Sequence, residues 1–70
     1  MQEMQEFRIR TYGRTELAQL YAPDLTSDAA CRKLKRWIVE NPQLRHLWRP
    51  DVRTFSPLEV SMIVSVLGEP

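Results

Sequence analysis

The stretch from Asp28 to Glu40 constrains the fold more than any other part of the sequence, because it predicts an amphipathic helix. At about 100° per residue, five side chains fall within one apolar arc of about 120°; they are Ala30, Cys31, Leu34, Trp37 and Ile38. Basic residues fill most of the remaining circumference, and Val39 lies among them. A helix of this kind packs one face against a core and presents a basic face to solvent.

A shorter helix is predicted before this one, over Glu16–Tyr21, where apolar residues follow helical spacing. Thr15 is the expected N-cap of that helix, and Pro23 is expected to stop it. Either Thr26 or Ser27 is expected to cap the long helix that follows. The chain therefore predicts two consecutive helices joined by a tight turn.

Two further helices are predicted after the long one. Asn41 is the expected N-cap of a short third helix, with Pro42 at its first position. The last helix has the best-marked start, because Ser56 and Glu59 have the spacing of a capping box. Gly68 is placed to end that helix as a C-terminal cap.

Extended structure is predicted at Phe7–Tyr12, which Gly13 ends, and at Val52–Phe55. These two stretches are the only candidates to pair with each other, either parallel or antiparallel. The predicted fold class is mostly α: a small helix-turn-helix domain of about four helices with a short two-stranded β ribbon. Residues 1–6 are expected to be a flexible N-terminal segment, and residues 7–70 a single domain.

Composition excludes several kinds of site. One cysteine and one histidine supply neither an intramolecular disulfide nor a Cys/His zinc site. We find no catalytic spacing of nucleophile, base or paired carboxylates, so we expect no enzyme, no catalytic residue, no metal and no cofactor. The polar N-terminus lacks a signal peptide, and no apolar stretch reaches the ~20 residues of a membrane span. A cytoplasmic protein with no membrane partner is the expectation.

The net charge of +1 is unevenly distributed along the chain. Residues 26–49 carry six basic against two acidic side chains, whereas residues 50–70 have an excess of two acidic ones. A basic helix after a tight turn is typical of helix-turn-helix proteins that bind double-stranded DNA. The predicted DNA contacts are Ser27, Arg32, Lys33, Lys35 and Arg36, with Arg45 and Arg49 clamping flanking phosphates. Arg8, Arg10 and Arg53 would extend this patch if the strands lie on the same side.

The last helix supports an alternative function, because apolar side chains cover nearly its whole circumference. Val60, Val64 and Leu67 lie outside its main apolar stripe and are the predicted contacts for self-association or for a protein partner. A protein-interaction module without nucleic-acid binding is therefore the alternative, and a homodimer fits both interpretations. RNA binding is a third one, which needs exposed aromatic rings. Only Trp48 is a candidate for this, and it fits a core position equally well.

Several strings along the chain resemble a family of short bacterial proteins catalogued as a domain of unknown function. They are Phe7–Ala18, Tyr21–Asp24, Leu34–Ile38, Asn41–Leu44, Thr54–Pro57 and Leu67–Pro70. The resemblance covers the chain from Phe7 to Pro70 and implies no established activity.

The layout is also similar, more loosely, to the helix-turn-helix of excisionase and MerR-type regulators. The similar residues are Glu16–Ala18, Leu25–Thr26 and Arg32–Trp37. The turn departs from that pattern, because Ala22 stands in place of the usual glycine and about two residues are added. This resemblance implies a transcriptional regulator or an accessory protein of a mobile element.

Overall fold

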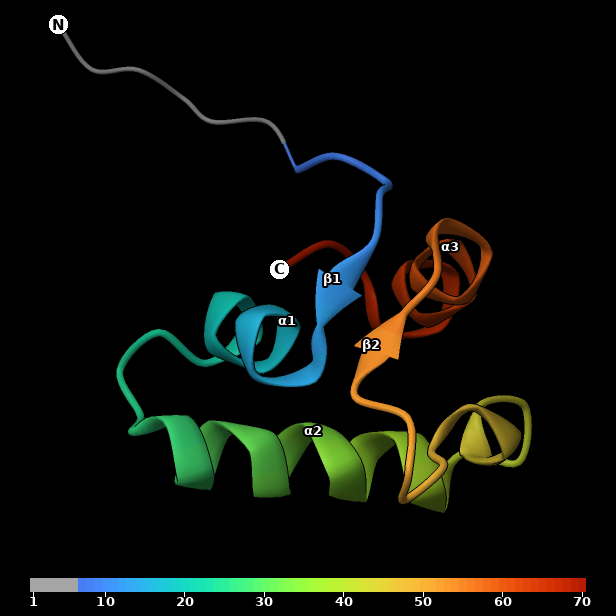
Figure 1. The fold of residues 1–70 in the computed structure, drawn as a ribbon. Helices are drawn as coiled ribbons and strands as arrows, with labels where there is room; N and C mark the ends of the chain where they lie inside the picture. The colour runs from blue at the N-terminus through green and yellow to red at the C-terminus, as the bar shows by residue number, and fades with distance from the viewer. Residues whose placement is uncertain (1–6) are drawn as a thin grey trace, which may run out of the picture.

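The computed structural model describes residues 7–70, in which three α-helices surround a small sheet (Figure 1). The elements in chain order are β1 (Tyr12–Gly13), α1 (Arg14–Tyr21), α2 (Ser27–Glu40), the 3-10 turn η1 (Arg45–Leu47), β2 (Thr54–Phe55) and α3 (Pro57–Leu67). The mostly helical fold with a two-stranded ribbon is confirmed. The segment 1–6, which we predicted to be flexible, lies outside the described residues.

The two strands pair antiparallel, with Tyr12 opposite Phe55 and Gly13 opposite Thr54. They are shorter than predicted, and Gly13 belongs to the first strand instead of ending it. The chain before Tyr12 is not paired in the sheet and bends at Arg10. The Tyr12 hydroxyl donates a hydrogen bond of 2.9 Å to the carbonyl oxygen of Arg8, which closes this bend.

Each strand runs directly into a helix whose third residue is a glutamate. At α3 the predicted capping box is confirmed: the Ser56 hydroxyl accepts from the Glu59 N–H at 3.2 Å, and the Glu59 carboxylate accepts from the Ser56 N–H at 2.9 Å. At α1 the predicted N-cap Thr15 is wrong, because Gly13 is the N-cap and the helix begins at Arg14, two residues earlier than predicted. The Glu16 carboxylate accepts from the Gly13 N–H at 3.1 Å and fixes that start.

The long helix α2 matches the prediction to within one residue. The Thr26 hydroxyl caps it by accepting from the Ala29 N–H at 3.2 Å. Ala30, Leu34 and Ile38 are buried along its inner face. In Figure 1 the helix runs along one edge of the molecule, below α1 and the sheet, so its opposite side is open.

The predicted third helix is only the 3-10 turn η1, so the described residues hold three α-helices and not about four. Asn41 is the C-cap of α2, and its side-chain oxygen accepts from the Gln43 N–H at 2.9 Å. Leu44 and Leu47 are both buried. Because a 3-10 turn repeats every three residues, it brings these two side chains to the same side of the backbone.

The core lies where α1, α2, η1, the sheet and α3 meet. It is built from apolar side chains that the sequence pattern largely identifies: Tyr12, Leu17, Ala18, Ala22, Ala30, Leu34, Ile38, Leu44, Leu47, Phe55, Val60 and Ile63. Within residues 7–70, no helix combines the length and the apolar character needed to cross a membrane.

Candidate nucleic-acid interface

The side of α2 that faces away from the core carries a line of four residues, which we call the outer ridge: Ala29, Arg32, Arg36 and Val39. Their spacing of three, four and three residues confines them to an arc of about 80° on an α-helix. This arc lies opposite the buried residues Ala30, Leu34 and Ile38. The ridge therefore belongs to the part of α2 that is farthest from the core.

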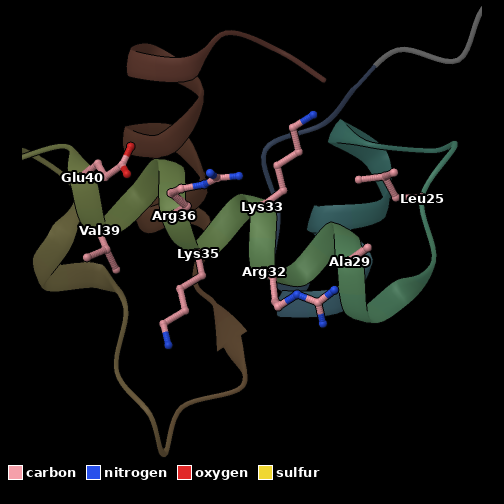
Figure 2. A pocket seen from close by; sticks show the side chains of 8 residues that line it. All are labelled: Leu25, Ala29, Arg32, Lys33, Lys35, Arg36, Val39 and Glu40. Atoms are coloured by element: carbon pink, nitrogen blue, oxygen red, sulfur yellow. The ribbon is translucent and has the colours of Figure 1, made fainter.

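Two lysines flank the outer ridge. Figure 2 shows Lys33 and Lys35 pointing to opposite sides of α2, with Arg36 between them. The Lys33 ammonium lies 5.3 Å from the centroid of the Trp37 ring, so a cation–π contact steadies that side chain. Lys35 extends toward solvent on the other side.

The exposed face of α2 carries four cations: Arg32, Lys33, Lys35 and Arg36. None of them forms an ion pair within residues 7–70. The ion pairs of that part of the chain use other arginines, Arg10 with Glu16 and Arg49 with Glu59. A solvated cation costs the fold little when it has no partner, and it keeps its full charge for a ligand. The basic face of α2 is thus available to an anionic partner.

The outer ridge and its neighbours line an open groove of about 700 Å³ (Figure 2). Its lining residues are Leu25, Ala29, Arg32, Lys33, Lys35, Arg36, Val39 and Glu40. Two apolar side chains are exposed there, Leu25 at 37% and Val39 at 41%. Seven of the eight lining residues come from α2, so the groove follows one helix at the edge of the molecule.

The acidic residues of α2 lie at the margins of this surface. Glu40 lines the groove at the C-terminal end of the helix. Asp28 instead lines a separate cavity of about 350 Å³, together with Arg14 and Arg53. The positive charge of the exposed face is therefore concentrated in the middle of α2.

The other predicted DNA contacts lie outside the groove. The Ser27 hydroxyl faces α1, where it donates a weak hydrogen bond of 3.4 Å to the side-chain oxygen of Gln19. Arg45 is exposed on η1. The guanidinium of Arg49 is held by Glu59 at 2.6 Å, so this arginine is occupied at the start of α3. The sequence carried no sign of that pair, whose partners are ten residues apart.

The arginines that were expected to extend the patch do not join the groove. Arg8 and Arg10 line a different cavity of about 280 Å³, beside Pro70. The Arg10 guanidinium lies 3.8 Å from the centroid of the Tyr12 ring and pairs with Glu16 at 3.0 Å. That hydrogen bond from Arg10, followed by the one from the Gly13 N–H, holds the pKa of Glu16 below its ordinary value.

The predicted contact surface on α3 is smaller than the sequence implied. Val60 is fully buried, because it faces the core of its own chain. Val64 and Leu67 are half-buried and pack against that core. Leu58, which the sequence analysis did not single out, is 71% exposed. Leu58 lies in the first turn of α3, directly after the sheet, and this position is the signal that could have identified it as exposed.

The aromatic and sulfur side chains complete the description. Trp48 is half-buried, with its ring centroid 6.1 Å from that of Phe55 and 4.6 Å from the guanidinium carbon of Arg14. Cys31 is half-buried and His46 is exposed. Among the described residues, no group of three His, Cys, Asp or Glu side chains is placed to hold a metal ion.

Comparison with known proteins places the chain in a family. A family model described as "Domain of unknown function (DUF4248)" matches residues 8–70. No curated protein and no solved structure matches the chain. The match confirms the first resemblance drawn from the sequence, whereas the looser one to excisionase and MerR-type regulators finds no support.

Proposed function

We propose that this chain, which belongs to the DUF4248 family of domains of unknown function, binds double-stranded DNA through the exposed face of α2. The observation that carries the proposal is the group of four cations on that face. Arg32, Lys33, Lys35 and Arg36 line one open groove, and none of them has an ion-pair partner within residues 7–70.

The dimensions of α2 support insertion into a major groove. The helix has 14 residues and is therefore about 21 Å long at 1.5 Å per residue. A helix of about 10–12 Å in diameter fits the major groove of B-DNA, which is about 12 Å wide. Ala29 on the outer ridge has a small side chain, so the backbone of α2 can approach the base edges closely at that position.

The charges have the chemistry that such a site requires. Lysine and arginine neutralise phosphates, and the arginine fork also matches the acceptor pair of guanine. Arg45, exposed on η1, is proposed as an additional phosphate contact beyond the end of α2. Arg49 is left out of this proposal because Glu59 occupies it.

In this proposal α1, the turn over residues 22–26 and α2 act as a helix-turn-helix, with α2 as the recognition helix. The close packing of α1 against α2 supports that role, since it fixes the orientation of the exposed face. A role as a transcriptional regulator or as an accessory protein of a mobile element remains a prediction.

The test is a titration of the full chain with a random-sequence duplex, read by fluorescence anisotropy at ~50 and ~200 mM salt. If four phosphates are neutralised, the slope of log affinity against log salt is about −3.6, a loss of roughly a hundredfold across this range. An absence of binding at the lower salt concentration contradicts the proposal.

The alternative is a protein-interaction module that uses α3. The exposed Leu58 favours this alternative, because an apolar side chain that is 71% exposed gains from being covered. The burial of Val60 weakens it, since that residue offers no surface to a partner. A chain that binds no duplex but associates through α3 would support this alternative.

A further inference from the structure

We infer that α2 reads base edges as well as phosphates, and that Val39 is a specificity-determining residue that contacts the C5-methyl groups of thymines. The inference rests on the proposed DNA binding and names the sequence feature that the site recognises. Its starting point is an apolar side chain, 41% exposed, in the last turn of α2 beside the basic residues of the groove.

A surface that binds phosphates alone has no use for this valine. Phosphate oxygens accept hydrogen bonds and attract cations, and they offer nothing apolar to cover Val39. In the major groove, the thymine methyl is the apolar group that base edges present. Burying the valine against such a methyl removes both from water, which is the favourable change that an exposed apolar side chain can gain.

The order of residues along the outer ridge places Val39 beside a guanine reader. Arg36 lies three residues before it, about 4.5 Å along the helix axis, which is close to one base-pair step of about 3.4 Å. Arg32 lies about 10.5 Å away, or roughly three steps. Figure 2 shows both arginines and Val39 on the exposed side of α2. The expected element is a thymine next to one guanine, with a second guanine about two base pairs farther.

The flanking lysines are placed to contact phosphates while the outer ridge contacts bases. Lys33 and Lys35 point to opposite sides of the helix (Figure 2), and the phosphates of the two strands border a major groove on its opposite sides. The lysines therefore meet the backbone when the outer ridge meets the bases.

The same mixture of cations and an apolar side chain would match an acidic amphipathic helix of a protein. The charge favours DNA, because the lining carries four cations against one carboxylate and a duplex presents phosphates at regular short intervals. Binding to thymine-containing DNA distinguishes the two directly.

The experiment begins by enriching duplexes from a random pool with the full-length chain. The best-bound duplex is then made in two forms, one with thymine and one with deoxyuridine, which lacks only the methyl group. The wild-type chain is expected to bind the deoxyuridine form about fourfold more weakly for each methyl in contact. Val39→Ala is expected to bind both forms equally, with an unchanged salt slope.

Leu20→Ala is the matched control, because Leu20 is 43% exposed on α1 and lies outside the groove. This variant is expected to retain the wild-type preference for thymine. Thermal unfolding of both variants checks that neither is destabilised.

Two results overturn the inference while leaving the proposed function intact. They are equal binding of both forms by the wild type, and an undiminished preference for thymine in Val39→Ala. A chain that binds no duplex at all overturns the inference and the proposed function together.

Discussion

The molecule uses arginines in two contrasting ways, one at the starts of α1 and α3 and the other on the outer ridge of α2. Arg10 and Arg49 each pair with a glutamate, at 3.0 and 2.6 Å. Arg32 and Arg36 have no such partner within residues 7–70. The difference separates cations that serve the fold from cations that remain available to a ligand.

The two paired arginines occupy equivalent places in the fold. In each case a short strand leads into a helix, and a glutamate at the third helical position accepts from the N–H of the N-cap residue. An arginine then binds the same carboxylate. Glu16 and Glu59 thus each bind the N-cap residue of a helix and an arginine at once.

On α2 the carboxylates lie at the margins and the cations lie between them. Asp28 faces the cavity that Arg53 also lines, and Glu40 lies at the C-terminal end of the groove. Changes on the buried side of α2 and at the paired arginines should therefore affect folding, whereas changes on the outer ridge should affect only binding.

The largest effect on folding is expected from Leu34→Ala, on the buried side of α2. Leu34 has no exposed surface, and truncating a buried leucine costs about 2–5 kcal/mol of unfolding free energy. Urea unfolding measures this loss, and Lys35→Ala is the control one residue away. A loss of less than about 1 kcal/mol for Leu34→Ala would show that the inner face does not hold α2 in place.

The next largest effect is expected from reversing charge on the outer ridge. Arg32→Glu with Arg36→Glu should weaken duplex binding by about a hundredfold or more at ~50 mM salt, because attraction to two phosphates becomes repulsion. The temperature midpoint of unfolding should stay near the wild-type value. Arg8→Glu, which reverses a charge in a different cavity, is the control and should bind within about threefold of the wild type. A loss in log affinity for Arg8→Glu of about half that of the double variant would mean that only net charge matters, since it changes half as many charges.

Some parts of this molecule can be predicted from the sequence better than others. It specified α2 and α3 well, because their caps and apolar faces are encoded by neighbouring residues. Thr26, Ser56 and Gly68 have the expected capping roles. The basic face of α2 was predicted for the same reason, since helical periodicity alone separates it from the buried side.

Features that depend on contacts between distant residues were predicted less well. The start of α1 was misplaced because Gly13 also pairs with Thr54, forty-one positions along the chain. Arg49 was assigned to DNA although Glu59 holds it, and Val60 was assigned to a partner although its own core buries it. In each case the competing contact exists only after the chain has folded.

The smallest expected effect is the pH dependence of stability that Glu16 contributes at the start of α1. The pKa of Glu16 is lowered from its ordinary value of 4.5, first by Arg10 and then by the Gly13 N–H. A carboxyl whose pKa is lower in the folded state stabilises the fold above its unfolded pKa, and this stabilisation is lost as pH falls through the folded value.

Thermal unfolding of wild type and Glu16→Gln should therefore differ most near neutral pH and converge toward pH 3. The side chain is exposed, so solvent screens the interaction and the difference should be small. A wild-type advantage that persisted unchanged at pH 3 would mean that the ionised carboxylate is not what stabilises this helix start.

The most direct test of the central claim is to map amide chemical-shift changes of the ¹⁵N-labelled chain during titration with a random-sequence duplex. The account predicts that the largest changes fall on the outer ridge and on its flanking lysines, with smaller changes on η1. The paired Arg10 and Arg49 should change little. Changes concentrated on α3, around Leu58, or no changes at ~50 mM salt, would contradict the assignment of the exposed face of α2 to DNA.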